Sequence, residues 1–246
     1  MKNLKIALIE MASAKGKIEE NFIKTISYIR RAKENGANLV VFPEMSLTGY
    51  FTEEKYKNSC VGIRSKFVQD IVKASYGMVI VFGIAELENN KRYITQVVAH
   101  DNKILGTYRK HNIGGKERGL FSEGKDLPCF QVKNLVFGIT ICADMDLAKL
   151  YKAYKEKGCM IVFECASPNL YGSREDRNWE KDYLWWKNNC IEKIGGYARD
   201  NKLYIAVATQ SGRNNDDDFP GGGYLFSQEG RIIKETKNHL DDVLFI

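Results

Sequence analysis

Three residues with reactive side chains stand where predicted strands end. Glu44, Lys110 and Cys142 each follow a run rich in apolar or β-branched residues. In open α/β sheets, ligands bind in the crevice beyond the carboxyl ends of the strands. We therefore expect these three side chains to converge there, although they are far apart in the sequence.

One carboxylate, one ammonium and one thiol are sufficient for nucleophilic catalysis. A thiol attacks an amide or nitrile carbon only as the thiolate. The Glu44 carboxylate can take the thiol proton, and the Lys110 ammonium can stabilise both the thiolate and the oxyanion that forms. The residue types thus predict covalent catalysis by Cys142.

These residues also lie within blocks that resemble, in order and position, those of the nitrilase superfamily of carbon–nitrogen hydrolases. The three blocks are Val40–Tyr50 (VVFPEMSLTGY), Tyr108–Lys110 (YRK) and Gly138–Asp144 (GITICAD). Residues Glu117–Gly124 (ERGLFSEG) resemble the family segment that carries a second glutamate, and Phe219–Phe226 resembles its late glycine-rich strand entry. The resemblance extends over almost the whole chain.

The resemblance implies a fold and a role for each residue. The fold would be a four-layer α-β-β-α sandwich, and such proteins commonly form homodimers through their outer helices. By resemblance, Cys142 is the nucleophile, Glu44 the general base and later acid, and Lys110 the electrostatic stabiliser. Glu117 would be the second carboxylate, and the backbone N–H of Ala143 would complete the oxyanion site. The resemblance implies no metal and no organic cofactor.

The sequence departs from the family pattern beside the nucleophile and after the lysine. The family usually has an aromatic residue, an aspartate and shortly a Phe-Pro-Glu after its cysteine. Here Cys142 is followed by Ala143, Asp144 and then Met145–Ala148 (MDLA). His111–Gly115 (HNIGG) replaces an apolar, proline-containing stretch. Both departures affect the predicted pocket, so the resemblance leaves the substrate open.

A second group of polar residues is predicted to form a pocket wall. Glu164, Ser167 and Asn169 follow a predicted strand, near where relatives contact substrate. A carboxylate at Glu164 would favour a substrate with a cationic end. Trp185 and Trp186 lie within a predicted helix, where such a pair either lines a pocket or packs against neighbouring elements.

Other motifs are incomplete and exclude several enzyme classes. Residues Gly119–Lys125 have the spacing of a phosphate-binding loop, but Asp126 stands where a Ser or Thr should coordinate magnesium. The chain has no GxSxG elbow, and its three histidines form no pair at metal-ligand spacing. The run Asp216–Asp218 could bind a cation, although the pattern favours a solvated loop.

The elements that must position these residues alternate between strands and helices, which predicts a layered α/β domain spanning residues 1–246. The predicted strands cover 4–10, 38–42, 78–85, 93–100, 104–109, 130–132, 135–141, 160–164, 203–208, 223–226, 231–234 and 244–246. The predicted helices cover 18–35, 64–75, 147–157 and 180–199. Residues 214–223 (NNDDDFPGGG) are predicted to form a polar, glycine-rich loop.

Composition sets limits on the partners. The 246-residue chain has 37 Lys and Arg against 31 Asp and Glu, and these charges are mixed rather than segregated, which argues against a nucleic-acid partner. The longest nearly apolar stretch, Met78–Leu87, is about half of the roughly 20 residues that a bilayer span needs. Glu10 interrupts the apolar N-terminal run, which favours a buried strand over a signal peptide. Six dispersed cysteines without CxxC spacing predict reduced thiols in a cytoplasm.

The sequence thus predicts a cytoplasmic, cofactor-free amidohydrolase that acts on a small linear amide or N-carbamoyl compound. Three alternatives remain open at this point. These are a nitrilase, an acyltransferase that uses the same thioester, and a non-catalytic binding or scaffold protein of the same fold. The last is disfavoured because Glu44, Lys110 and Cys142 are all present.

Overall fold

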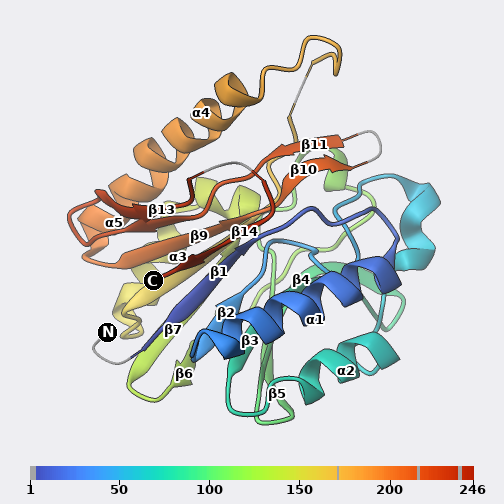
Figure 1. Cartoon of the computed structure of the whole chain (residues 1–246), viewed down its shortest axis with the longest axis horizontal. Helices are drawn as coiled ribbons and strands as arrows, with labels where there is room; N and C mark the ends of the chain where they lie inside the picture. Colours follow the sequence, from blue (N-terminus) through green and yellow to red (C-terminus); the bar gives the residue numbers. More distant parts are fainter. Residues whose placement is uncertain (1–3, 171, 215–216, 238–239) are drawn as a thin grey trace.

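Two six-stranded sheets form the centre of the molecule in the computed structural model, which describes residues 4–170, 172–214, 217–237 and 240–246. The first sheet has the order β14-β1-β2-β3-β4-β5 (Figure 1). Its strands are β1 (Ile6–Glu10), β2 (Leu39–Val41), β3 (Val79–Glu88), β4 (Lys91–His100), β5 (Lys103–Arg109) and β14 (Asp242–Phe245). The second sheet has the order β13-β12-β9-β8-β7-β6. Its strands are β6 (Phe130–Val132), β7 (Leu135–Ile141), β8 (Ile161–Ala166), β9 (Tyr204–Thr209), β12 (Tyr224–Phe226) and β13 (Ile232–Glu235).

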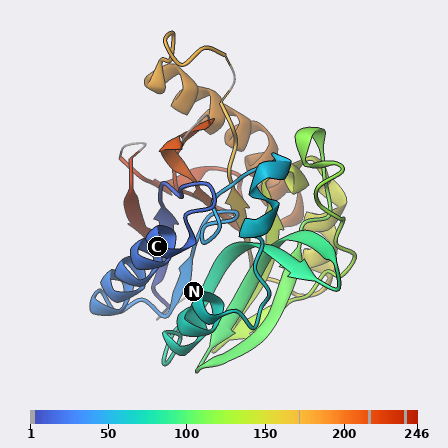
Figure 2. The same cartoon turned by 90° about the vertical axis from the view of Figure 1, so that its right-hand side faces the viewer.

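Helices cover the outer face of each sheet. On the first sheet these are α1 (Ile18–Glu34) and α2 (Lys66–Lys73). On the second they are α3 (Ala148–Glu156), α4 (Trp179–Asn189), the π-helical turn η4 (Cys190–Ile194) and α5 (Gly195–Asn201). Three short 3-10 helices complete the helical elements: η1 (Glu54–Ser59), η2 (Gly115–Glu117) and η3 (Cys142–Asp146). Figure 2 shows the two helical layers on opposite sides of the sheets.

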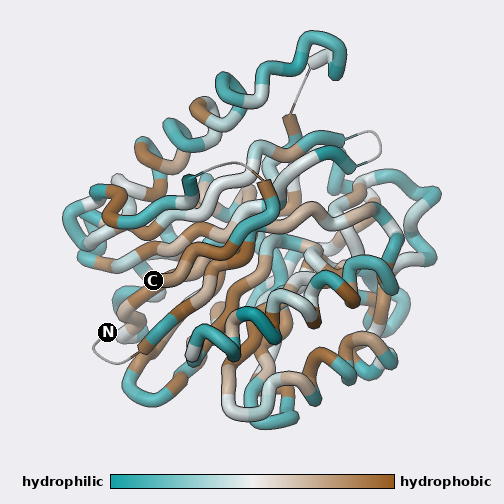
Figure 3. Tube along the Cα trace, viewed as in Figure 1, coloured by the Kyte–Doolittle hydropathy of each residue, from teal (hydrophilic) through white to brown (hydrophobic). Residues whose placement is uncertain are grey.

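Strand β1 shows how the sequence builds these layers. All five of its residues are buried, as expected for a strand that is covered on both faces. Ile6 and Leu8 pack between the sheets, together with apolar residues of β7 such as Ile139. Ala7 and Ile9 point the other way and pack with Ile29 and other residues of α1. The apolar residues therefore concentrate along the strands (Figure 3), and the predicted α-β-β-α sandwich is confirmed.

Parallel strands at the middle of each sheet bring the carboxyl ends together. Strands β1, β2 and β3 are parallel in the first sheet, and β7, β8 and β9 are parallel in the second. Glu44 follows β2, Cys142 follows β7 and Ser167 follows β8. Among the described residues, no helix is both long and apolar enough to cross a membrane.

Two predicted elements differ in the structure. The helix predicted over residues 180–199 is divided by the π-helical turn η4, beyond which Gly195 lies against the β12–β13 turn. A Cβ atom at Gly195 would be only 2.8 Å from the Gly230 carbonyl oxygen, so glycine permits this close contact.

The predicted polar loop 214–223 instead contributes to a two-stranded ribbon of β10 (Ser211–Asn214) and β11 (Asp217–Pro220). Asp218 is buried and forms ion pairs with Arg174 (2.6 Å) and Arg177 (3.2 Å). The prediction of a solvated loop was therefore wrong for Asp217 and Asp218, while Asp216 lies outside the described residues.

Candidate active site

The turn that carries Glu44 lies directly against strand β3. Gly83 permits this approach, because a Cβ atom there would be 2.3 Å from the Met45 amide nitrogen. The Gly83 N–H donates to Ser46 Oγ (3.0 Å), and the Gly83 carbonyl accepts from the Leu47 N–H (2.9 Å). Both bonds fix the backbone around Glu44, whose side chain is completely buried.

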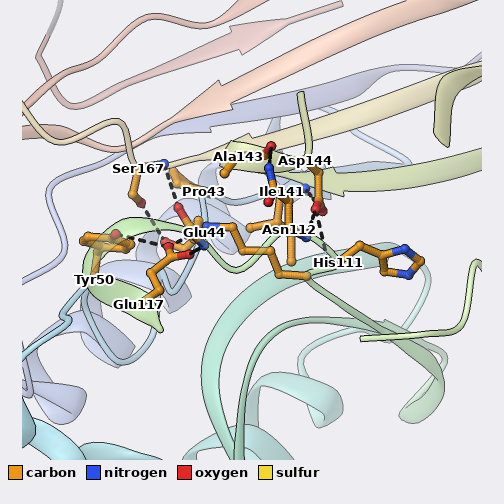
Figure 4. A network of polar contacts seen from close by, with 12 residues as sticks. Pro43, Glu44, Tyr50, His111, Asn112, Glu117, Ile141, Ala143, Asp144 and Ser167 are labelled. Atoms are coloured by element: carbon orange, nitrogen blue, oxygen red, sulfur yellow. Dashed lines mark hydrogen bonds and ion pairs between the residues drawn. The ribbon is translucent and has the colours of Figure 1, made fainter. Parts of the chain in front are cut away.

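Lys110 joins two buried carboxylates at the end of β5. Its Nζ lies 2.8 Å from Glu44 Oε1 and 2.6 Å from Glu117 Oε1. Tyr50 also joins the cluster, since its hydroxyl donates a hydrogen bond to Glu117 Oε1 (3.1 Å). Figure 4 shows Glu44, Tyr50 and Glu117 close together at this point. The predicted residues Glu44, Lys110 and Glu117 therefore form one cluster.

Ser167 holds the other oxygen of Glu44. The Ser167 N–H donates to Glu44 Oε2 (3.1 Å), and Ser167 Oγ lies 2.9 Å from Gln210 Oε1 and 3.1 Å from the Glu44 carbonyl oxygen. Both carboxylate oxygens of Glu44 thus have a fixed donor. The bond from the turn after β8 ties the second sheet to the first at this point.

Cys142 stands at a strained turn between β7 and η3. Its φ of 45° lies in the left-handed region, which few non-glycine residues occupy. The Cys142 thiol lies close enough to the Glu44 carboxylate to contribute to lowering its pKa. The residue is partly exposed and lines a pocket.

Asp144 fastens the Cys142 turn to the segment after Lys110. Its carboxylate accepts hydrogen bonds from the Tyr108 hydroxyl (2.7 Å) and the Ile141 N–H (3.0 Å). It also accepts from the N–H groups of His111 (3.0 Å) and Asn112 (2.7 Å) (Figure 4). These four donors come from both sheets. Asp144 therefore sets the position of the thiol relative to the lysine.

Burial and neighbouring charge determine the protonation of the cluster. Burial raises the pKa of Glu44 to about 7, although the charge of Lys110 opposes this rise. Burial would lower the pKa of Lys110, but Glu44, Cys142 and Glu117 together raise it well above its usual range. Burial and the charge of Glu44 raise the pKa of the Cys142 thiol. The resting site therefore holds a neutral thiol beside a carboxylate that can accept its proton near neutral pH.

A pocket of about 580 Å³ opens above Cys142. Of the predicted residues, Lys110, Glu117, Ala143, Ser167 and Asn169 line it together with Cys142. Glu164 does not. It is completely buried and accepts hydrogen bonds from Thr140 (2.5 Å) and Tyr151 (3.0 Å), because its strand turns this side chain toward α3.

Several lining residues were not predicted. They come from the segment after Lys110, from η3 and from the α4–η4 helix: Asn112, Lys116, Met145, Asp146, Asn189 and Lys193. Trp185 and Trp186 both line the pocket, and Trp186 also donates from Nε1 to Thr209 Oγ1 (3.0 Å). Within the described ranges, no group of three or more His, Cys, Asp or Glu residues could hold a metal ion.

Comparisons with known proteins identify the family of this chain. The family model described as carbon-nitrogen hydrolase matches residues 5–245. The chain belongs to the carbon–nitrogen hydrolase family. It is 24% identical over 251 residues to a glutamine-dependent NAD(+) synthetase of Acinetobacter baylyi, covering 100% of this chain and 44% of that protein. This carbon–nitrogen hydrolase chain therefore spans less than half the length of that relative.

Two further relatives are similar along more of their own length. An omega-amidase of Danio rerio is 27% identical over 224 residues, covering 85% of this chain and 75% of that protein. A solved structure of an amidase mutant from Nesterenkonia sp. AN1 has a TM-score of 0.84 at 18% identity, covering 99% of this chain and 89% of that chain. That structure shows covalent addition of the acetamide moiety of fluoroacetamide at the active site cysteine. The fold of this chain is thus that of the nitrilase superfamily.

Proposed function

We propose that this protein is an amidase that hydrolyses a small linear amide or N-carbamoyl compound through a thioester on Cys142. The observation that supports this most strongly is the buried cluster of Lys110 with Glu44 and Glu117 beside the thiol at the base of the pocket. The amidase and omega-amidase among the similar proteins support an amide substrate.

The first half of the proposed reaction forms the thioester. As Cys142 Sγ attacks the carbonyl carbon, its proton passes to the Glu44 carboxylate. The oxyanion that develops is stabilised by the Lys110 ammonium and the Ala143 N–H. Glu44 then returns the proton to the leaving nitrogen, the C–N bond breaks, and ammonia or an amine departs.

The second half consumes water. Glu44 takes a proton from a water molecule as its oxygen attacks the thioester carbon, the C–S bond breaks, and the proton returns to the thiolate. One amide and one water thus yield one carboxylic acid and one amine or ammonia. In this scheme Glu117 keeps Lys110 charged and in place without exchanging a proton itself.

Ammonia release from the purified protein tests the proposal. The panel comprises short linear amides, N-carbamoyl compounds and nitriles, with Cys142→Ala measured in parallel and Cys165→Ala as the matched control. We expect turnover of amides or carbamoyl compounds that disappears only in Cys142→Ala. Product that appears only when an amine acceptor competes with water would indicate acyl transfer. Silence of all three proteins toward the whole panel would contradict the proposed function.

We also propose that the protein forms a homodimer through its outer helices. Three large apolar side chains are exposed on α4 and η4, namely Leu184 (46%), Trp185 (44%) and Ile191 (44%). A second copy would cover this surface. Light scattering should give twice the monomer mass of 28.1 kDa, and a monomer at micromolar concentration would contradict the proposal.

A further inference from the structure

Three charged side chains line the pocket outside the buried cluster. They are Lys116 from η2, Asp146 at the end of η3 and Lys193 from the π-helical turn η4. The other lining residues beyond the cluster are uncharged. Recognition of a charged substrate group outside the buried cluster therefore depends on these three residues.

Asp146 lies a short distance from the nucleophile. Helix η3 starts at Cys142 and ends at Asp146, and a 3-10 helix rises by about 2 Å per residue, or about 8 Å over four residues. A substrate of only a few carbon atoms can therefore place its amide at Cys142 and its opposite end beside Asp146.

Asp146 and Lys193 form an ion pair that is open to solvent. Lys193 Nζ lies 2.5 Å from Asp146 Oδ1, and the two side chains are 41% and 52% exposed. Exposed pairs of this kind contribute only about 0–1 kcal/mol to stability. A ligand with matching charges can replace this contact at little cost, unlike the buried contacts of Lys110.

The charges of these three side chains favour a ligand group that carries both a positive and a negative charge. Among the described residues, no carboxylate lies within ion-pair distance of the exposed Lys116, so the three side chains comprise two cations and one anion. A carboxylate alone would use the lysines but face repulsion from Asp146. An ammonium alone would meet Asp146 but face two lysines. A zwitterion satisfies all three.

We propose that Asp146, Lys193 and Lys116 bind the zwitterionic end of a short ω-amide, the ammonium at Asp146 and the carboxylate at the two lysines. The inference rests on the proposed amidase function and specifies its substrate class. It assigns to Asp146 and Lys193 the choice of substrate, and it assigns them no part in bond cleavage.

Four amides that differ only in their charged groups test this assignment. L-glutamine carries both groups, glutaramate lacks the ammonium, 4-aminobutanamide lacks the carboxylate, and butanamide lacks both. We expect kcat/KM of the wild type to be highest for L-glutamine. Asp146→Asn should lower the ratio of L-glutamine to glutaramate by about tenfold or more, since a charged hydrogen bond is lost. Lys193→Gln should lower the ratio of L-glutamine to 4-aminobutanamide to a similar extent.

Asp70→Asn is the matched control, because Asp70 forms an exposed pair with Lys66 (2.7 Å) on α2, away from the pocket. It should leave both ratios unchanged. If butanamide is hydrolysed as well as L-glutamine, or if Asp146→Asn behaves like Asp70→Asn, the inference is overturned while the amidase function stands.

A binding measurement separates failure of the inference from failure of the function. Titration of Cys142→Ala with L-glutamine, followed by the fluorescence of Trp185 and Trp186, needs no turnover. Binding that Asp146→Asn weakens by about tenfold supports the inference even if no amide is hydrolysed. The inference is overturned if Cys142→Ala does not bind L-glutamine, or if it binds L-glutamine equally well with and without Asp146→Asn.

Discussion

The Lys110–Glu44 contact and the Lys193–Asp146 contact are alike in length and opposite in environment. Lys110 lies 2.8 Å from Glu44 and is 1% exposed, whereas Lys193 lies 2.5 Å from Asp146 and is 41% exposed. In the buried cluster, water is excluded, so each charged side chain is stabilised mainly by its charged partner. The same burial raises the pKa of Glu44. At the solvent-exposed rim of the pocket, formed by Asp146 and Lys193, water readily replaces a lost partner. Burial thus separates a site suited to proton transfer from one suited to ligand exchange.

The largest expected effect is that of removing the buried cation. Lys110→Met leaves Glu44 and Glu117 buried without a counter-charge, so we expect a loss of about 3–5 kcal/mol in the free energy of unfolding. We also expect kcat to fall by about 100- to 1000-fold, because the oxyanion loses its charged partner. Urea denaturation and ammonia release measure the two effects. A stability change no larger than that of Lys193→Met would remove the distinction between the two regions.

The Asp144 carboxylate connects the nucleophile to the segment after Lys110, and its removal should have the next largest effect. Asp144→Ala leaves four donors without their acceptor. We expect kcat to fall by about 100-fold, since small displacements of reacting groups have effects of this size. Asp144→Asn retains one acceptor oxygen and should recover part of the rate. A change in the ratio between L-glutamine and glutaramate, with kcat preserved, would contradict a positioning role.

The pH dependence of activity should report the raised pKa of Glu44. The carboxylate must be ionised to take the thiol proton, so kcat/KM should rise with pH through a pKa of about 7 and fall about tenfold per pH unit below it. Glu44→Gln should abolish the activity, and with it this acidic limb of the pH profile. An acidic limb near pH 4.5 would show that the cluster does not raise this pKa.

Stability should change in the opposite direction over the same range. The pKa of Glu44 in the folded protein lies above its ordinary value of 4.5, so the folded state holds more protons between pH 4.5 and about 7. The stabilising contribution of protonated Glu44 is complete below pH 4.5 and is lost as pH rises through 7. Urea midpoints for the wild type and Glu44→Gln measure it, and identical pH slopes would contradict it.

The smallest expected effect is at the rim. Lys193→Met breaks a half-exposed pair and should change the free energy of unfolding by less than about 1 kcal/mol. Urea denaturation beside Lys66→Met, which disrupts the exposed pair on α2, provides the comparison. A loss of several kcal/mol would show that the rim pair is structural and would weaken its assignment to substrate binding.

The sequence predicted the buried region better than the rim. Glu44 and Cys142 each follow a buried strand of a parallel set, and apolar runs of this kind identify both the strand and its carboxyl end. The strand predicted over Leu135–Ile141 is confirmed to the residue. Residues at the ends of such strands can therefore be predicted from the local pattern of apolar residues.

The rim could not be predicted in this way because its residues meet through tertiary contact. Lys193 reaches the pocket from a π-helical turn, and no periodicity in the sequence signals such a turn. Asp146 differs from other surface acids only by its position four residues after Cys142. Glu164 was expected at the pocket wall because it lies at the end of a predicted strand, near where relatives contact substrate. The alternation along β8 instead directs its side chain to Thr140 and Tyr151.

The proposed reaction requires Cys142 to carry an acyl group during turnover. Mass spectrometry of the intact protein and its peptides, after acid quenching during turnover of a short amide, tests it most directly. The account predicts an acyl adduct on the peptide that contains Cys142 and none in Cys142→Ala. An adduct on another cysteine, or steady turnover by Cys142→Ala, would contradict it.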